Sequence, residues 1–299
     1  MVTIRQSVVK SFTRFYPFYS GCGTLANHSM IEKMAGVSNE VVWTNIFGSK
    51  ILAPLDDYIG RAAYYCGELD RKISWICDRI VRPGDTVLDI GANIGMVTLL
   101  LSKLVGENGN VHSFEPNPKI KKMLEETLAH NQVSNVCLHP IALGEEQGLL
   151  ELRIPSHNAG AASLIRNINS RDIDLVEVPV CPLSDIITEK GIESIRLIKI
   201  DVEGFEAQVL RGGRKVLESI RPEAILFELN GKIEGSVANQ PVIKILRDLG
   251  YAFFSIPRCF VRMHLNSFDP DMSHQLIGHD FLAVPEESYE KMAKLVRAC

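Results

Sequence analysis

The residues of this chain best suited to holding a ligand are a short glycine-containing turn and an acidic residue that follows it. The turn spans residues 91–95 (Gly-Ala-Asn-Ile-Gly) and comes directly after an apolar stretch that contains Asp89, while Glu115 ends a second apolar stretch. A strand, a tight turn and a helix in this order bring backbone N–H groups and a helix N-terminus to one point. A nucleotide-like ligand fits there, and Glu115 can accept two hydrogen bonds from ribose hydroxyls.

The spacing of the glycines indicates which nucleotide this is. A dinucleotide fingerprint has glycine at its first, third and sixth positions, whereas this chain has Gly91, Asn93 and Met96 there. Asp89 would also repel a pyrophosphate, but it suits a ligand that carries an ammonium and a sulfonium group. S-adenosylmethionine carries both, together with a carboxylate for the helix N-terminus and a ribose for Glu115. The alternative is an ordinary α/β crossover in which the turn serves only as a turn.

Further polar residues follow the later predicted strands. Asp201 and Glu203 come after the fourth strand, and Glu228 lies at the end of the fifth. Ala142 and Leu143 follow the third strand and can pack against an adenine. Ligands in open α/β sheets bind beyond the carboxyl ends of the strands. We therefore expect these residues to face one crevice.

Strand and helix patterns alternate from residue 86 onwards. This alternation predicts an α/β fold with a doubly wound, mostly parallel, seven-stranded sheet and helices on both faces. No helix separates the last two strands, which predicts an antiparallel hairpin at one edge. Two further strands (149–154 and 175–180) and a short helix (184–190) interrupt the alternation. The main predicted strands are 86–90, 110–114, 136–142, 197–201, 224–229, 251–256 and 281–284, and the main predicted helices are 94–105, 118–131, 205–220 and 240–249.

The first 80 residues lack the alternation of strands and helices seen in the rest of the chain. We therefore predict a mostly helical N-terminal extension or cap (1–80) ahead of a catalytic domain (81–299). The extension contains a strand-like piece at 41–46 and a helical pattern at 58–80. Near its start, a helical pattern puts apolar and aromatic residues on one face, where aromatic side chains supply large buried areas. We expect this face to pack against the catalytic sheet, to cap the acceptor site or to form a homodimer contact. The residues of that face are Val8, Phe12, Phe15 and Tyr19.

The chain resembles the FkbM-like family of S-adenosylmethionine-dependent methyltransferases. The resemblance rests on Asp-Ile-Gly-Ala-Asn-Ile-Gly at 89–95, Phe-Glu-Pro at 114–116 and Asp-Val-Glu-Gly-Phe-Glu at 201–206. It implies a class I, Rossmann-like methyltransferase domain and O-methylation of a polyketide, sugar or glycolipid. It also implies that Asp201 and Glu203 lie at the reaction centre. The expected cofactor contacts are Asp89, Gly91, Ala92, Asn93, Gly95, Glu115, Pro116, Asn117, Ala142, Leu143 and Asp201.

Methyl transfer to a hydroxyl requires an aligned acceptor and a group that removes the hydroxyl proton. Asp201, Glu203 and Glu228 can act as the base, or they can hold Mg²⁺ through their oxygens. His157, in a polar loop, is a further candidate base.

Two alternatives to an O-methyltransferase remain at this point. An N-methyltransferase is disfavoured because the Asn/Asp-Pro-Pro-Tyr/Phe sequence typical of many amine methyltransferases does not follow the fourth strand. A non-catalytic nucleoside-binding module is disfavoured because Asp89, Glu115 and Asp201 are all present.

Composition limits the partners. With 46% hydrophobic and 23% charged residues, the chain has the composition of a globular protein. A net charge of −4 argues against nucleic acid as a partner. We expect no transmembrane helix and no secretory signal, because no long apolar run exists. The seven cysteines form no Cys-x-x-Cys pair, which favours reduced thiols, a cytoplasmic location and no zinc motif. The expected acceptor is a small molecule or glycolipid.

Overall fold

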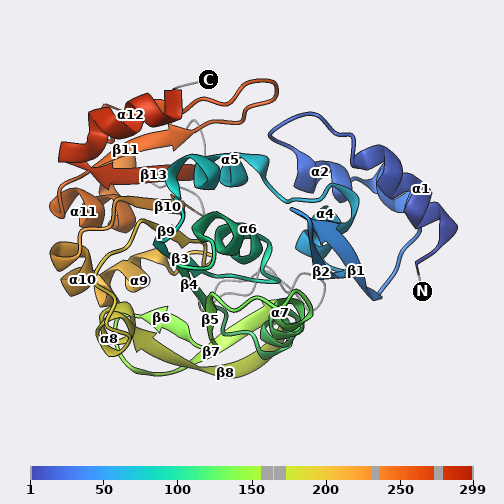
Figure 1. The fold of residues 1–299 in the computed structure, drawn as a ribbon, viewed down its shortest axis with the longest axis horizontal. Helices are drawn as coiled ribbons and strands as arrows, with labels where there is room; N and C mark the ends of the chain where they lie inside the picture. The colour runs from blue at the N-terminus through green and yellow to red at the C-terminus, as the bar shows by residue number, and fades with distance from the viewer. Residues whose placement is uncertain (1, 156–163, 165–172, 230–235, 273–278, 298–299) are drawn as a thin grey trace.

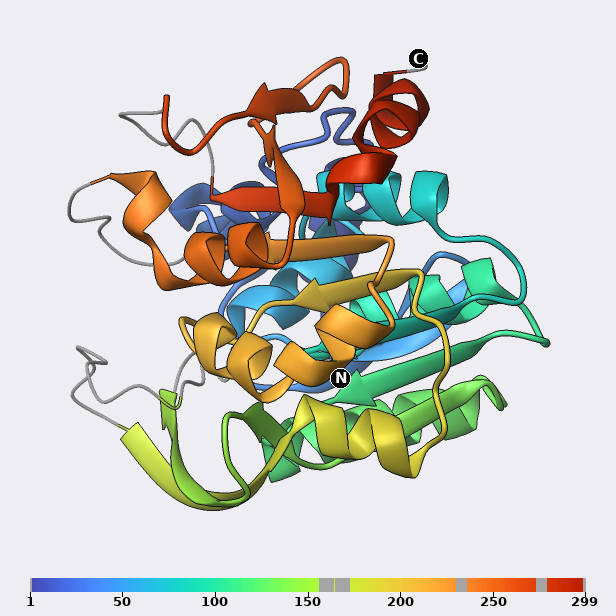
Figure 2. The same cartoon turned by 90° about the vertical axis from the view of Figure 1, so that its left-hand side faces the viewer.

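A central mixed sheet organises the chain, which we describe from a computed structural model that covers residues 2–155, 164, 173–229, 236–272 and 279–297. The sheet has eight strands in the order β12-β11-β13-β10-β9-β3-β4-β5 (Figures 1 and 2). The strands are β3 (Thr86–Ile90), β4 (Asn110–Phe114), β5 (Val136–His139), β9 (Leu197–Ile200), β10 (Ala224–Glu228), β11 (Tyr251–Ile256), β12 (Asn266–Phe268) and β13 (Asp280–Pro285).

The pairing of these strands confirms the predicted sheet and adds one strand. Strands β10, β9, β3, β4 and β5 are parallel neighbours. Strand β13 is antiparallel to both β10 and β11, as the edge-hairpin prediction required. Seven strands were expected, but β12 pairs with β11 as an eighth. This strand lies in the segment between β11 and β13. It has only three residues and contains no apolar run from which a strand could be predicted.

The strand order reverses between β3 and β9. From β3 the chain winds outward to β4 and β5, whereas from β9 it winds in the other direction to β10. At such a switch point the connections leave in opposite directions and open a crevice beyond the carboxyl ends of the strands. Ile90 pairs with Ile200 across this junction. The turn at 91–95 and the segment from Asp201 therefore start side by side.

Helices cover both faces of the sheet. One face is packed by α5 (Arg71–Ile80), α6 (Met96–Val105) and α12 (Tyr289–Arg297). The other is packed by α8 (Leu183–Glu189), α9 (Glu206–Gly212), α10 (Arg214–Ser219) and α11 (Pro241–Asp248). Helix α7 (Pro118–His130) packs beside β2 (Ser49–Pro54). Within the described ranges, no helix is long and apolar enough to cross a membrane.

Two predicted elements are divided in the structure. The strand expected at 136–142 breaks at Pro140, which has no N–H to continue the ladder, so β5 ends at His139. The chain then enters a small separate sheet formed by β6 (Ala142–Gly144), β7 (Gly148–Pro155) and β8 (Ile173–Pro182), seen below the central sheet in Figure 1. The helix expected at 205–220 is interrupted at Gly213, between α9 and α10.

The N-terminal region combines helices with a hairpin. It contains α1 (Ile4–Thr13), α2 (Cys22–Ala26), α3 (Ser29–Ala35), α4 (Tyr58–Tyr65) and a hairpin of β1 (Val41–Ile46) with β2. The helical pattern at 58–80 is divided into α4 and α5, with Gly67 at a positive φ between them.

The predicted apolar face of the first helix is not the buried one. Helix α1 buries Gln6, Val9 and Thr13, whereas the side chains of Phe12 and Phe15 are 74% and 85% exposed. The hydroxyl of Thr13 donates to the carbonyl of Tyr65 at 2.6 Å. Polar anchoring of this kind, which the apolar pattern does not reveal, orients the helix.

Candidate active site

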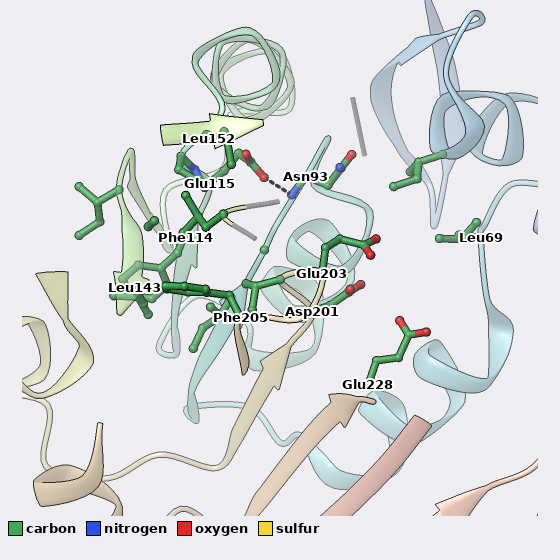
Figure 3. A pocket seen from close by; sticks show the side chains of 18 of the residues that line it. Leu69, Asn93, Phe114, Glu115, Leu143, Leu152, Asp201, Glu203, Phe205 and Glu228 are labelled. Atoms are coloured by element: carbon green, nitrogen blue, oxygen red, sulfur yellow. Dashed lines mark hydrogen bonds between the residues drawn. The ribbon is translucent and has the colours of Figure 1, made fainter. Parts of the chain in front are cut away.

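A cavity of about 270 Å³ lies beyond the carboxyl ends of β3, β4, β9 and β10. Figure 3 shows its two halves: Phe114, Leu143, Leu152 and Phe205 form an apolar side, while the carboxylates of Asp201, Glu203 and Glu228 point into the other side. Most of the predicted site residues line it, namely Gly91, Asn93, Glu115, Pro116, Ala142, Leu143, Asp201, Glu203 and Glu228.

The turn after β3 is closely packed at Gly91. This residue has a φ of +79°, and a Cβ atom there would lie 1.9 Å from the carbonyl oxygen of Asp201. Only glycine permits this approach. The amides of Gly91 and Ala92 donate to the carbonyl of Phe114 at 3.1 and 3.0 Å. The turn at Gly91 therefore packs the carboxyl ends of β3, β4 and β9 against one another.

Glu115 is held in place by backbone amides. One carboxylate oxygen accepts from the Asn93 amide and the other from the Asn117 amide, both at 2.8 Å. The residue is 6% exposed, and burial raises the pKa of Glu115 to about 7 although these hydrogen bonds oppose the shift. Each carboxylate oxygen accepts more than one hydrogen bond, so Glu115 retains acceptor capacity toward the cavity.

Asp89 does not line the cavity, so the direct ligand contact expected for it stays a prediction. Its side chain is fully buried. One oxygen accepts from the Thr98 hydroxyl at 2.7 Å, and the other lies 3.4 Å from the Lys199 ammonium. Burial opposes the charge of Lys199, but Asp89 and Asp201 outweigh it and raise the pKa of Lys199. The ammonium in turn donates to the carbonyl of Gly91 at 2.8 Å, so Asp89 acts on the turn through Lys199.

Three further predicted contacts lie outside the main cavity, and as cofactor contacts they stay predictions. Gly95 packs against α7, since a Cβ atom there would lie 2.4 Å from a methyl carbon of Leu124. Asn117 caps α7 through its side-chain oxygen. Neither residue lines the main cavity. Ala92 lines a smaller hollow of about 90 Å³ beside it, which also contains Gly91, Asn93 and Asp201.

The carboxylates at the ends of β9 and β10 repel one another. Burial, followed by repulsion from Asp201, raises the pKa of Glu203 to about 7. Burial and repulsion from Asp201 and Asp280 raise the pKa of Glu228 to about 8. These two groups therefore titrate near neutral pH, where a general base is most effective.

Glu206 is a positioning residue that the sequence did not single out. It is 3% exposed, and one carboxylate oxygen accepts from the amides of Gly204 at 3.0 Å and Val202 at 3.4 Å. These bonds close the turn in which Glu203 has a φ of +51°. An acidic residue in the first turn of α9 was a detectable signal, but it suggests only a favourable helix N-terminus.

The Mg²⁺ alternative stays a prediction. Among the described residues, Asp201, Glu203 and Glu228 are not a group of three whose oxygens all lie within 4.8 Å of one another. Mg²⁺ is usually held by only one or two carboxylates together with water. His157, the other candidate base, lies outside the described residues.

The N-terminal region contributes residues that the sequence did not assign to the site. Tyr58 and Ile59 of α4, together with Leu69, line the main cavity opposite the small sheet. Strand β7 adds Leu152. The sequence around these residues contains no motif that indicates a binding site. Only the folded structure shows that they line the cavity.

A second cavity of about 490 Å³ adjoins the first and shares Tyr58, Leu69, Asp201 and Glu228 with it. Its remaining lining contains both apolar and charged residues. The Lys72 ammonium lies 2.7 Å from an Asp280 oxygen and 3.2 Å from an Asp70 oxygen, and Arg258 and His279 lie nearby.

Chain segments distant in sequence close this second cavity. Backbone amides of Tyr19 and Ser20 donate to the carbonyls of Phe260 at 3.0 Å and Cys259 at 2.8 Å. Ser20 and Phe260 both line the cavity. The N-terminal region thus forms part of the wall that faces the carboxylates.

Comparisons with known proteins agree with this geometry. A model of the methyltransferase FkbM domain matches residues 89–253, more than half of the chain. The chain is 33% identical over 159 residues to 31-O-demethyl-FK506 methyltransferase FkbM of Streptomyces tacrolimicus, covering 44% of this chain and 60% of that protein. It is 28% identical over 160 residues to 2-O-methyltransferase NoeI of Sinorhizobium fredii, covering 49% and 64%.

The matched segment thus spans about 60% of the length of these curated relatives. Among solved structures, a SAM-dependent O-methyltransferase of Thermotoga maritima is 14% identical with a TM-score of 0.37, covering 72% of this chain and 64% of that one.

Proposed function

This chain belongs to the methyltransferase FkbM domain family, and on that premise we propose that it is an S-adenosylmethionine-dependent O-methyltransferase. The acceptor is a hydroxyl of a small molecule, sugar, glycolipid or polyketide. The observation that carries the proposal is the pair Glu203 and Glu228, two carboxylates with pKa values near neutrality. Both line the first cavity, and Glu228 also lines the second.

The residues of the first cavity fit this methyl donor. Glu115, fixed by two amides, is placed for the ribose hydroxyls. The apolar side formed by Phe114, Leu143 and Leu152 suits an adenine ring. The opposite carboxylates suit a ligand with two positive charges. When bound, S-adenosylmethionine supplies an electrophilic methyl group.

The chain's own residues then orient the acceptor and take up its proton. The acceptor hydroxyl reaches the carboxylates from the second cavity, which shares Asp201 and Glu228 with the first. Glu203 or Glu228, when ionised, accepts the hydroxyl proton and leaves an oxygen of higher nucleophilicity. Alignment by the cavity walls supplies a further part of the acceleration.

The charged residues in the lining of the second cavity favour a hydroxyl-rich acceptor. Lys72, Asp70 and Asp280 form a charged cluster there, and Arg258 is exposed to the same space. Groups of this kind hydrogen-bond sugar hydroxyls. The names of two relatives, which describe O-methylation, agree with a hydroxyl acceptor.

The proposal is tested by incubating the purified protein with S-adenosylmethionine that carries a labelled methyl group and with fractions of a cell extract. Mass spectrometry then identifies the labelled product. Label on an oxygen that is lost in Glu203→Gln and Glu228→Gln supports the proposal. Label on nitrogen shows an N-methyltransferase, and binding of the donor without any transfer indicates a nucleoside-binding module.

The same assay tests the role of metal. If the carboxylates act as bases, omitting Mg²⁺ from the buffer leaves turnover unchanged. Activity that depends on added Mg²⁺ would contradict the base assignment.

A further inference from the structure

Two histidines and a cysteine meet at the edge of the central sheet, away from the proposed active site. His112 lies on β4, and Cys137 and His139 lie on the neighbouring edge strand β5. In the parallel register His112 pairs with Cys137, and His139 is two residues further along β5. Side chains at paired positions and at every second residue point to the same face of a sheet. The topology thus places all three side chains together.

The ligand atoms of these residues are close. His112 Nδ1 and His139 Nε2 are 3.1 Å apart. One ring nitrogen of each histidine and the Cys137 sulfur all lie within 4.8 Å of one another. In the described part of the chain, this is the only such group of three histidine, cysteine or acidic residues.

We propose that His112, Cys137 and His139 bind a Zn²⁺ ion, with a fourth coordination position left for water. Imidazole nitrogens and thiolates are both ligands that zinc takes in proteins. The site is separate from the methyl-transfer chemistry, and the proposal does not depend on the acceptor or on the proposed function.

The distances require little rearrangement. With Zn–N distances of about 2.0 Å and Zn–S of about 2.3 Å, two ligand atoms on a tetrahedral zinc lie about 3.3–3.6 Å apart. The two nitrogens are already close to this spacing, at 3.1 Å. Cys137 is exposed, so its side chain is free to rotate toward them. The ion would replace the proton that the two imidazoles now share.

The charged groups that face this cluster belong to the end of α8 and offset each other. The Lys190 ammonium pairs with a Glu189 oxygen at 2.9 Å. Lys190 disfavours a cation nearby, and Glu189 favours one. The ion pair leaves no large net charge against Zn²⁺.

The ion would stabilise the wall of the proposed cofactor cavity. His139 stacks on Phe114, with ring centroids 4.5 Å apart and an interplanar angle of 12°. The His139 carbonyl also accepts from the Glu115 amide at 3.1 Å. Zinc would cross-link the edge strand β5 to β4, next to two residues that line the cavity.

The test uses the tag-free full-length protein, stripped of metal with a chelator and desalted. Titration with Co²⁺ should give a near-ultraviolet thiolate-to-cobalt band that saturates at one equivalent, and Zn²⁺ should abolish it by displacement. Zn²⁺ should also raise the Tm, since a ligand that binds only the folded state stabilises it. Cys137→Ser should lose the band, and His139→Gln should weaken Zn²⁺ binding at least tenfold.

Matched controls separate this site from others. Cys181→Ser removes another partly exposed thiol and His130→Gln another histidine, and both should behave like the unmodified protein. Absence of the band, its persistence in Cys137→Ser, or its loss in Cys181→Ser overturns the proposal. Because Cys137 is exposed, its serine variant keeps the test decisive even if His139→Gln fails to fold.

Discussion

At the scale of single residues, the protonation of Glu203 and Glu228 determines how well the site holds a cation. Burial, followed by repulsion from Asp201, raises their pKa values to about 7 and about 8. A bound sulfonium or ammonium group would favour the ionised forms and lower both pKa values. Binding of a cationic ligand is therefore coupled to proton release in this pH range.

We predict that S-adenosylmethionine binds more tightly as the pH rises from 6 to 9. If the ligand lowers the pKa of one carboxylate by about one unit, affinity rises about tenfold for that group. Isothermal titration calorimetry measures this. S-adenosylhomocysteine, which lacks the sulfonium charge, is the matched ligand and should show a smaller change. Equal pH dependence for the two ligands would contradict the assignment.

The same raised pKa makes Glu228 a source of instability. Its folded-state pKa of about 8 exceeds the ordinary value of 4.5, so the folded state binds more protons between these limits and loses stability as the pH rises through them. We predict that Glu228→Gln raises the Tm at pH 8.5 and has little effect at pH 4. Glu126→Gln, at an exposed position on α7, should leave the Tm unchanged at both pH values.

Glu115 has two roles, and the substitution must separate them. Glu115→Ala would remove the acceptors that hold the amides of Asn93 and Asn117, so loss of binding in that variant would have two explanations. Glu115→Gln keeps one side-chain oxygen, which can still accept from one of the two amides. We predict that this variant keeps the fold but weakens S-adenosylmethionine binding at least tenfold. A hydrogen bond to a charged group contributes about 1.5–3 kcal/mol. Calorimetry with circular dichroism as the fold control checks this, and unchanged affinity would remove Glu115 from the ribose site.

At the scale of elements, the junction of β3 and β9 depends on one glycine. We predict that Gly91→Ala lowers stability by several kcal/mol and abolishes turnover, because the added Cβ atom would meet the Asp201 carbonyl at 1.9 Å. Gly191 is the matched control, since it also has a positive φ but a Cβ atom added there would have nothing within 4 Å. Gly191→Ala should cost only about 1–2 kcal/mol. Equal losses in the two variants, measured by urea unfolding, would show that φ strain alone matters.

Elements that carry a strong local signal were predictable from the sequence. Strands β3 and β4 begin and end where expected, because a parallel strand buried on both faces is a continuous apolar run with clear turn residues beside it. Pro140 and Gly213 are residues that commonly end strands and helices, but the apolar pattern continues across both positions. The pattern alone therefore predicted one strand at 136–142 and one helix at 205–220, each of which is divided in the structure.

Site residues that follow the ends of strands were predictable from the sequence. Residues whose orientation depends on contacts with distant parts of the chain were not. Glu115, Asp201, Glu203 and Glu228 follow strands, and all of them line the cavity. Asp89 also ends a strand, but the burial of its side chain against Lys199 depends on β9, more than a hundred residues later.

At the scale of the whole molecule, the N-terminal region closes the second cavity but supplies little of the first. Ser20 lines only the second cavity, while the earliest residue that lines the first is Tyr58. Arg14 also donates to the carbonyls of Ala63 and Tyr64, which supports α4. The region therefore bears mainly on the second cavity, where we propose that the acceptor binds.

We predict that deleting residues 1–20 lowers methyl transfer to the acceptor more than it lowers binding of S-adenosylmethionine. The deletion opens the second cavity and removes the Arg14 bonds to α4. Calorimetry and the methyl-transfer assay measure the two effects, and light scattering shows whether oligomer size falls as well. If transfer and oligomer size both match those of the full chain, the segment has no part in the site.

The pairing of residues 19–20 with 259–260 also fixes the order in which the protein can mature during its synthesis. Ser20 and Cys259 are 239 positions apart in the chain. At about 5–20 residues per second, a ribosome needs on the order of ten seconds or more to make that span. The described lining of the first cavity is complete once Glu228 has emerged, whereas the second waits for Asp280. The last residue that lines the first cavity thus leaves the ribosome well before the last residue that lines the second.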